Sequence, residues 1–343
     1  MKGGRALALF SGGLDSILAC RVIMAQGIEV RALKFVTPFF DHHLLERREQ
    51  YQREIREKYQ IEVDVVDLSR GYIDLLKQPA HGFGKHFNPC IDCKILMLTR
   101  ARERMALHAA SFLITGEVLG QRPMSQRRDT MRVIERDSGC EGILLRPLCA
   151  KRMNPTLPEE QGLVDRDRLY GFTGRGRKQQ IALAGEFGIT DFPNPAGGCL
   201  LTDPNLATRI ERFYNGLFLL SHEQFRADDF RLLLVGRQFR LPGGHWFVLG
   251  RNQGENKRLR GLAGPGDYLL SMVERPGPTG LLRGDAGIDA QILAHAAGLV
   301  VRYGKREGAV RSPADVRCRH QGEEQCLRMT APLEDGVFQQ WMA

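Results

Sequence analysis

The sequence has no hydrophobic run that approaches the roughly 20 apolar residues a membrane-spanning helix needs. Its N-terminal apolar stretch is also too short for a signal peptide. Internal repeats and low-complexity tracts are missing as well, which excludes repeat architectures. We therefore expect a globular, cytoplasmic protein without membrane contacts.

Acidic residues are in deficit: 40 Asp and Glu face 49 Lys and Arg, a net charge of +9. This balance favours a polyanionic partner, although a basic protein without nucleic acid has the same composition. The 343 residues, 43% of them hydrophobic, suffice for about two domains with proper cores. The eight cysteines of such a cytosolic chain indicate metal binding, catalysis or burial rather than disulfides.

The chain also lacks the Walker pattern G-x-x-x-x-G-K-[ST]. A different glycine-containing segment, Ser11–Ser16 (SGGLDS), lies between a strand expected at 6–10 and a helix expected at 17–24. A glycine turn before a helix N-terminus presents free N–H groups and a positive dipole end to an anion. Asp15 cannot bind phosphate directly and needs a bridging Mg²⁺ or a neighbouring cation. A glycine turn without a ligand is the alternative.

Strand-like and helix-like segments alternate to about residue 205, which predicts an α/β fold: a parallel sheet with helices on both faces. We expect strands at 29–35, 62–68 and 111–115 and helices at 42–59 and 95–108. Ligands of such sheets bind beyond the carboxyl ends of the strands, where three segments fall: Ser11, Lys34-Phe35 and Gly116.

A second domain is expected at 226–343, after a helical connector at 206–225. There, short strands replace the helical alternation, at 230–235, 245–250, 268–273 and 299–303, with one helix at 285–297. This pattern predicts a small α+β domain.

Cys90 and Cys93 form a C-x-x-C pair just before the helix expected at 95–108. This spacing lets two thiolates bind one metal or one cluster. The helix N-terminus and Lys94 also favour a lowered thiol pKa and a nucleophilic cysteine. A third cysteine, Cys199, follows two glycines.

Three blocks in order carry a family resemblance: the Ser11–Ser16 hexapeptide, Thr115–Gln121 (TGEVLGQ) with Ser125-Gln126, and residues 197–203 (GGCLLTD). Residues 5–205 thereby resemble the ThiI-like tRNA sulfurtransferases (4-thiouridine synthases) of the PP-loop ATP pyrophosphatases. The resemblance implies an adenine nucleotide alpha hydrolase-like fold and ATP-dependent tRNA thiolation. In this reaction a uridine carbonyl oxygen is adenylated and sulfur then displaces AMP.

The resemblance also implies the cofactors ATP and Mg²⁺ and a set of site residues. Asp15, Cys93 and Cys199 are the expected catalytic residues. Nucleotide contacts fall on Ser11, Gly12, Gly13, Asp15, Ser16, Lys34, Phe35, Lys94, Gly116 and Gln126, of which Lys34 and Phe35 hold the adenine.

The thiols leave several interpretations open. A related branch of PP-loop thiolation enzymes holds a 4Fe-4S cluster on a C-x-x-C pair plus one distant cysteine, which Cys90, Cys93 and Cys199 match. A persulfide on one cysteine of the pair, resolved by Cys199, is the competing hypothesis. A zinc site completed by His81 or His86, and unrelated buried thiols, are the others.

The chain departs from well-known members by lacking room for a THUMP domain before the PP-loop and a rhodanese domain at its end. RNA capture and sulfur supply must therefore come from elsewhere. Residues 249–259 resemble the G-R-N-x-x-x-N loop of the NFACT-R domain, an RNA-binding module, and 301–307 with 310–313 resemble its later strand pair. This second resemblance implies that residues 226–343 bind RNA.

The expected partners are tRNA and a sulfur donor, either sulfide or a cysteine desulfurase, while a homodimer remains open. Basic residues that suit an RNA backbone, or equally a solvated loop, are Arg127, Arg128, Arg175, Arg177, Lys178, Arg251, Lys257 and Arg258. The rival functions are a PP-loop ligase that adenylates a small carboxylate without RNA, and a binding protein for RNA quality control.

Overall fold

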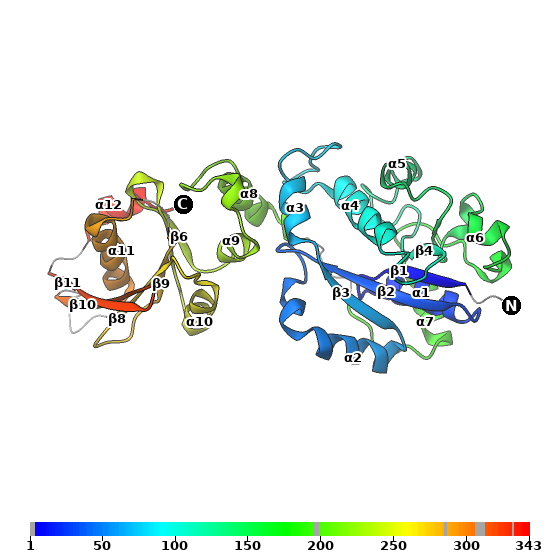
Figure 1. Ribbon diagram of the computed structural model, residues 1–343, viewed down its shortest axis with the longest axis horizontal. Helices are drawn as coiled ribbons and strands as arrows, with labels where there is room; N and C mark the ends of the chain where they lie inside the picture. Colours follow the sequence, from blue (N-terminus) through cyan, green and yellow to red (C-terminus); the bar gives the residue numbers. More distant parts are fainter. Residues whose placement is uncertain (1–3, 195–198, 285–286, 306–312, 331–332) are drawn as a thin grey trace. The chain divides into compact units, whose positions relative to one another are not determined.

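The computed structural model describes residues 4–194, 199–284, 287–305, 313–330 and 333–343 (Figure 1). The chain divides into two compact units, Met1–Asp203 and Pro204–Ala343, and each is described by itself. None of the helices in these ranges is both long enough and apolar enough to span a bilayer.

The first unit is built on a five-stranded parallel sheet in the order β3-β2-β1-β4-β5. The expected parallel α/β fold is confirmed. The strands are β1 (Arg5–Leu9), β2 (Glu29–Val36), β3 (Glu62–Asp67), β4 (Phe112–Thr115) and β5 (Leu144–Leu145). The helices are α1 (Leu14–Met24), α2 (Arg48–Tyr59), α3 (Ser69–Leu75), α4 (Cys90–Glu103), α5 (Arg128–Ser138), α6 (Leu157–Glu160) and α7 (Lys178–Glu186).

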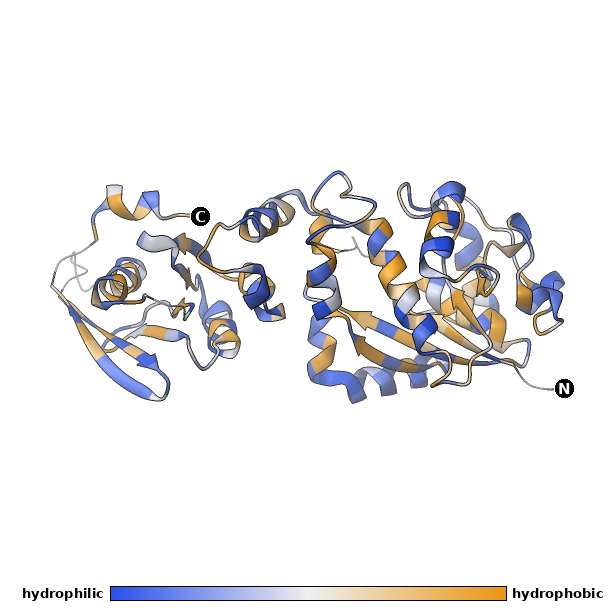
Figure 2. Cartoon of the chain, turned by 45° about the horizontal axis from the view of Figure 1, so that its top comes forward, coloured by the Kyte–Doolittle hydropathy of each residue, from blue (hydrophilic) through white to orange (hydrophobic). Residues whose placement is uncertain are grey.

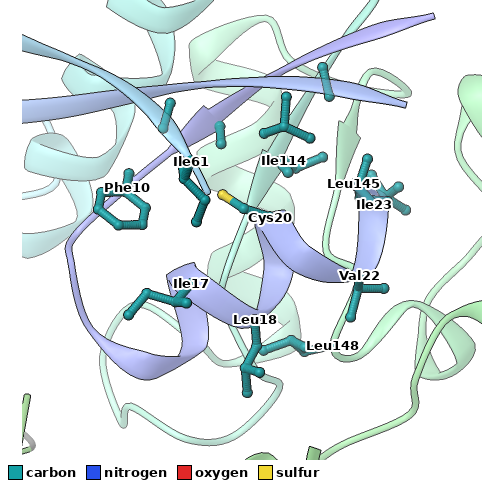
Figure 3. Packing of buried hydrophobic residues seen from close by; sticks show 14 of the residues in the cluster. Phe10, Ile17, Leu18, Cys20, Val22, Ile23, Ile61, Ile114, Leu145 and Leu148 are labelled. Atoms are coloured by element: carbon teal, nitrogen blue, oxygen red, sulfur yellow. The ribbon is translucent and has the colours of Figure 1, made fainter. Parts of the chain in front are cut away.

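Helices cover both faces of this sheet because its central strand is apolar on both sides. Ala6 and Ala8 pack with α1, α2 and α7, whereas Leu7 and Leu9 pack with α4 and α5. Figure 3 shows the first of these cores, where Cys20 lies fully buried, as expected for a core cysteine. Figure 2 shows hydrophobic residues along the strands and hydrophilic residues along α2.

Two helix boundaries differ from the prediction. The helix expected at 42–59 is interrupted at Arg47, whose φ of −136° is not helical, so a 3₁₀ turn precedes α2. The helix expected at 95–108 begins at Cys90 and ends at Glu103, so the C-x-x-C pair lies inside its first turns. The 3₁₀ turns of the chain are η1 (His42–Arg47), η2 (Ala150–Arg152), η3 (Arg166–Arg168), η4 (Leu200–Thr202), η5 (His222–Gln224) and η6 (Pro242–Gly244).

The second unit contains a six-stranded antiparallel sheet in the order β11-β10-β8-β9-β7-β6. Its strands are β6 (Arg237–Arg240), β7 (Trp246–Leu249), β8 (Tyr268–Met272), β9 (Gly280–Leu282), β10 (Ala314–His320) and β11 (Glu323–Met329). Its helices are α8 (Pro204–Tyr214), α9 (Ala227–Leu232), α10 (Gln253–Leu262), α11 (Ala290–Tyr303) and α12 (Asp335–Gln340). The apolar face of α11 packs on the sheet and forms the core.

Two strands predicted in this unit are wrong. Residues 230–235 form the end of α9 and the turn after it, and residues 299–303 form the last turns of α11. Short apolar runs are ambiguous between a buried strand and a buried helix, and both runs belong to helices here. The strand pair expected over 301–313 is also misplaced: β10 and β11 follow it, at 314–329. Residues 285–286 and 306–312 lie outside the described ranges.

Candidate active site

The Ser11–Ser16 loop joins the carboxyl end of β1 to the N-terminus of α1, as predicted. Gly12 has a φ of +84°, which a residue with a Cβ rarely adopts. Gly13 is the N-cap of α1, and no side chain caps this helix end. The Ser11 Oγ atom accepts from the Gly13 amide at 3.2 Å and donates to the Ser16 Oγ atom at 3.1 Å. The loop is thus an open helix N-terminus lined by two hydroxyls.

Gly116, just after β4, packs directly against this loop. A Cβ at this position would lie 2.5 Å from the carbonyl carbon and oxygen of Asp15 and from the Ser16 nitrogen. The ends of β1 and β4 therefore meet closely only because residue 116 has no side chain.

Asp15 has one oxygen in use and one free. The Gln121 Nε2 atom donates to the Asp15 Oδ2 atom at 2.9 Å. The Asp15 Oδ1 atom is buried without a hydrogen-bond partner among the residues the structure describes, as are the Oε1 atoms of Gln121 and Gln126. Buried oxygens without donors suit a hard cation such as Mg²⁺. Gln121 was missing from the predicted site, although it closes the same TGEVLGQ block.

Lys34 and Phe35 lie at the carboxyl end of β2 but differ in role. The Lys34 Nζ atom donates to the Ser11 carbonyl at 2.5 Å and to the Asp41 Oδ2 atom at 2.6 Å, so it braces the loop. The Phe35 side chain packs in the core, and the residue pairs with Val66 of β3 in the sheet. The Tyr51 hydroxyl lies 3.2 Å from the Cβ position of Gly12.

The three expected cysteines gather around one tyrosine. The Tyr72 hydroxyl lies close enough to the thiols of Cys93, Cys199 and Cys90 for each of them to affect its pKa, which burial raises well above its usual value. Cys199 is far away in sequence, and its segment is tied to the end of β2 by a bond from the Leu200 amide to the Phe39 carbonyl at 3.1 Å. Residues 195–198, which include its two preceding glycines, lie outside the described ranges.

The expected lowering of the thiol pKa is not seen at Cys93. Burial raises the pKa of the Cys93 thiol to about 11, and Lys94 and Tyr72 offset only part of this rise. Burial likewise raises the pKa of the Cys199 thiol to about 12. Both sulfurs are therefore protonated at neutral pH, because the low-polarity surroundings disfavour the thiolate.

An ion network connects the cysteine helix to the phosphate loop. The Lys94 Nζ atom lies 3.5 Å from the Glu117 Oε1 atom, and the Glu117 Oε2 atom lies 3.1 Å from the Arg146 Nε atom. Burial opposes ionisation of Glu117, but Lys94 and Arg146 outweigh it and lower the pKa of this carboxyl. Since Glu117 follows Gly116, α4 and the Ser11–Ser16 loop are held at one edge of the sheet.

A metal centre is not formed by the side chains of the described residues, where no three His, Cys, Asp or Glu are grouped to hold a metal ion. Of the two suggested zinc ligands, His81 is engaged elsewhere: its Nε2 atom lies 2.9 Å from the Asp137 Oδ2 atom. The cysteine grouping therefore rests on the shared proximity of the thiols to Tyr72.

The basic candidates of the first unit lie in two segments. Arg127 pairs with Asp129 at 3.2 Å, and Arg128 donates to the Arg152 carbonyl at 2.7 Å. Farther along, Arg175 and Lys178 are exposed at the start of α7, whereas Arg177 is half-buried.

In the second unit, the motif residues of the loop before α10 serve the fold. The Asn252 Oδ1 atom caps α10 by accepting from the Glu255 amide at 3.0 Å. The Asn256 Oδ1 atom accepts from the Thr279 amide at 3.0 Å. Arg251 is exposed but paired with Glu255 at 2.5 Å, whereas Lys257 and Arg258 are exposed without an ion pair in the described part of the chain.

Comparison with known families locates both resemblances. Residues 1–154 match the ThiI family. This family is described as thiamine biosynthesis protein (ThiI). Residues 236–342 match the NFACT-R_2 family, described as the NFACT protein RNA binding domain. The two resemblances expected from the sequence are thus confirmed for these segments.

Curated relatives match less than half of the chain. The "Probable tRNA sulfurtransferase" of Ureaplasma parvum serovar 3 (strain ATCC 27815 / 27 / NCTC 11736) is 30% identical over 152 residues, 43% of this chain and 37% of that protein. Its namesake from Ureaplasma urealyticum serovar 10 is 30% identical over 147 residues, 42% and 36% of the two chains. The chain therefore spans well under half of the length of these relatives.

Among solved structures, the chain is similar to a "4-thiouridine synthetase - RNA complex with bound ATP". The identity is 22% and the TM-score 0.39, over 55% of this chain and 41% of that one.

Proposed function

We propose that the chain is an ATP-dependent tRNA sulfurtransferase that converts a uridine of tRNA to thiouridine. One observation carries the proposal: Gly116, Glu117 and Lys94 hold an open phosphate loop and a thiol-bearing helix at the same edge of one sheet. The names of the curated relatives and the RNA-binding description of the second family support tRNA as the substrate. A ligase for small carboxylates needs no thiols there.

The first step is adenylation of the uridine. The backbone N–H group of Gly12 would bind the ATP phosphates, with Gly116, Gln126 and Lys94 as further contacts. The Gly13 amide and the hydroxyls of Ser11 and Ser16 would exchange their hydrogen bonds within the loop for bonds to phosphate oxygens. Mg²⁺ held by Asp15 would shield the phosphate charge. A uridine carbonyl oxygen attacks the α-phosphate, and pyrophosphate leaves. Lys34 keeps the loop in place through the Ser11 carbonyl.

The second step is sulfur transfer from a cysteine persulfide. We place the persulfide on Cys93, supplied by sulfide with an oxidant or by a cysteine desulfurase. Its terminal sulfur attacks the activated carbon, and AMP leaves. Cys199 then loses its proton to solvent and attacks the Cys93 sulfur, which frees the thiouridine and leaves a disulfide for a thiol reductant. Because burial raises the pKa of the Cys199 thiol, this step is favoured at high pH. Both thiols lie close to the same Tyr72 hydroxyl, in keeping with such a pair.

A 4Fe-4S cluster on Cys90, Cys93 and Cys199 is chemically reasonable for three thiolates. The arrangement in the described residues does not fit it, because the three cysteines are not grouped closely enough there to hold a metal ion. We therefore derive no step from a cluster.

The deciding experiment combines pyrophosphate release with mass spectrometry of tRNA nucleosides. We expect Asp15→Ala to lose pyrophosphate release, since stabilisation of developing charge by such a group is worth about 3 kcal/mol or more. Cys93→Ser and Cys199→Ser should keep pyrophosphate release but lose thiouridine, while Cys326→Ser, an exposed thiol of the second unit, should keep both. Unchanged pyrophosphate release in Asp15→Ala contradicts the proposal.

Iron and sulfide analysis of anaerobically purified protein decides between the two sulfur carriers. We expect thiolation without stoichiometric iron. If the protein contains iron, and Cys90→Ser loses both the iron and the thiolation activity, the sulfur carrier is a cluster and not a persulfide.

A further inference from the structure

The loop between α3 and α4 carries an aromatic pair that the proposed chemistry does not use (Figure 1). The rings of Phe83 and Phe87 are stacked, with centroids 4.4 Å apart and planes at 19°. Phe87 is only 7% exposed, whereas Phe83 is 41% exposed. The buried ring thus braces the exposed one by stacking, and part of Phe83 is open to solvent.

Asn88 fastens this loop to the thiols. The Gly84 amide donates to the Asn88 carbonyl at 3.0 Å, which closes the loop around Phe87. The Asn88 Nδ2 atom donates to the Cys90 Sγ atom at 3.1 Å. Phe83 therefore precedes a turn that is bonded directly to one of the three site cysteines.

The other end of the loop is fastened to the same helix. The Asp92 carboxylate accepts from the amides of Ala80 at 3.1 Å and His81 at 3.0 Å. Asp92 lies between Cys90 and Cys93 in the first turn of α4. Both ends of the loop are thus held by the turn that carries the C-x-x-C pair, so the aromatic pair is fixed relative to the thiols.

The loop also packs on the segment that contains Gln126. A Cβ at Gly84 would lie 2.7 Å from both the Asn88 Nδ2 atom and the Met124 Cε atom, so the backbone approaches closely there. The loop that carries Phe83 thus lies at the rim of the site, where Asn88 contacts the Cys90 thiol and Gly84 lies against Met124, just before Ser125-Gln126.

We propose that Phe83 is a stacking platform for the target uridine of the tRNA. A base that undergoes chemistry must leave its stack, and aromatic side chains hold such extruded bases by their faces. One exposed ring presents the area of a single base rather than of a protein interface. Lys85 beside it is exposed, so its ammonium group can meet the nucleotide's phosphate. The substrate named here rests on the proposed function.

Tryptophan fluorescence tests the platform without relying on thiolation. The native Trp246 and Trp341 are 1% and 9% exposed, so Phe83→Trp introduces an exposed indole at the rim. We expect a tRNA transcript and an oligouridylate each to quench this added emission, because stacking on a base quenches an indole. The unsubstituted protein supplies the baseline.

Kinetics supply the second readout. Phe83→Ala should lower kcat/KM for tRNA by about 5- to 100-fold, the range expected for loss of one base stack, with ATP affinity unchanged. Phe83→Tyr should restore most of it. Leu107→Ala is the matched control, an exposed apolar residue at 79% exposure after α4, and should change neither value.

The outcomes separate the platform from the proposed function. If both RNAs quench the fluorescence but the protein does not thiolate tRNA, the stacking proposal for Phe83 holds and the proposed sulfurtransferase function is wrong. Thiolation without quenching, or full kcat/KM in Phe83→Ala, would remove the platform and keep the sulfurtransferase. No quenching and no thiolation would remove both.

Discussion

Gly116 lets the ends of β1 and β4 meet at the phosphate loop, and Gly116→Ala tests whether this close approach is needed for ATP binding. In Gly116→Ala the new Cβ would lie 2.5 Å from backbone atoms of Asp15 and Ser16, so the loop must shift. We expect ATP affinity to fall about ten-fold or more and the free energy of unfolding to drop by about 1–3 kcal/mol. Titration with labelled ATP and urea unfolding measure the two effects.

The control for this variant is Gly185→Ala, at the end of α7, where a Cβ meets nothing within 4 Å. It should be neutral or stabilising by up to about 1 kcal/mol, because alanine favours a helix over glycine. Equal ATP affinity in the two variants would mean that residue 116 does not shape the loop.

Burial of the Cys93 thiol predicts a steep pH dependence of its alkylation. Its pKa is raised to about 11, so the reactive thiolate is scarce at neutral pH and its population grows about ten-fold per pH unit. We therefore expect the rate with iodoacetamide to rise through about pH 10, as followed by peptide mass spectrometry. A plateau below about pH 9 would contradict the burial effect.

At the scale of residues, the sequence predicted which cysteines come together but neither their protonation nor the tyrosine beside them. The spacing of Cys90 and Cys93 and the motif around Cys199 predicted that they meet. Tyr72, which lies beside them, has no motif of its own and is known only from tertiary packing. The same packing reverses the expected pKa of Cys93. Gln121 was recognisable in principle, because it belongs to the block that contains Gly116.

At the scale of elements, α10 depends on its N-cap. The Asn252 side chain accepts from the Glu255 amide, so Asn252→Ala leaves that donor without its partner. We expect the second unit to lose about 0.5–2 kcal/mol of unfolding free energy. Gln253→Ala, the next residue and exposed, should change stability by no more than about 0.5 kcal/mol. Urea unfolding of both variants measures this, and equal stabilities would mean that the cap contributes nothing.

Elements of the first unit were more predictable than those of the second. Parallel strands buried on both faces are short apolar runs separated by amphipathic helices, and β1 and β4 follow this pattern. The edge strand β3 alternates buried and partly exposed residues instead. In α11, by contrast, Leu299, Val300 and Val301 are all buried, so their run resembled a strand. The hairpin of β10 and β11 was expected too early in the chain, although Ala314, Val316 and Cys318 of β10 are buried in alternation with polar residues.

At the scale of the whole molecule, the positive charge of the chain must act through particular exposed cations. Arg251 is paired with Glu255, so Lys257 and Arg258 are the free cations of its segment in the described structure. If they contact tRNA phosphates, each releases about one counterion, and binding weakens with salt. We expect Lys257→Ala and Arg258→Ala each to lower the slope of log affinity against log salt by roughly one.

Lys58→Ala is the control for this measurement. It removes the same charge from an exposed residue of the first unit, which is paired with Asp191 at 2.6 Å and lies on α2. Titrations of labelled tRNA at several salt concentrations should leave its slope unchanged. If all three variants have the slope of the unsubstituted protein, the segment around Lys257 does not bind the RNA backbone. If Lys58→Ala lowers the slope as much as Lys257→Ala and Arg258→Ala do, net charge and not a defined RNA surface determines binding. Each variant removes one positive charge, so only a defined surface makes their effects differ.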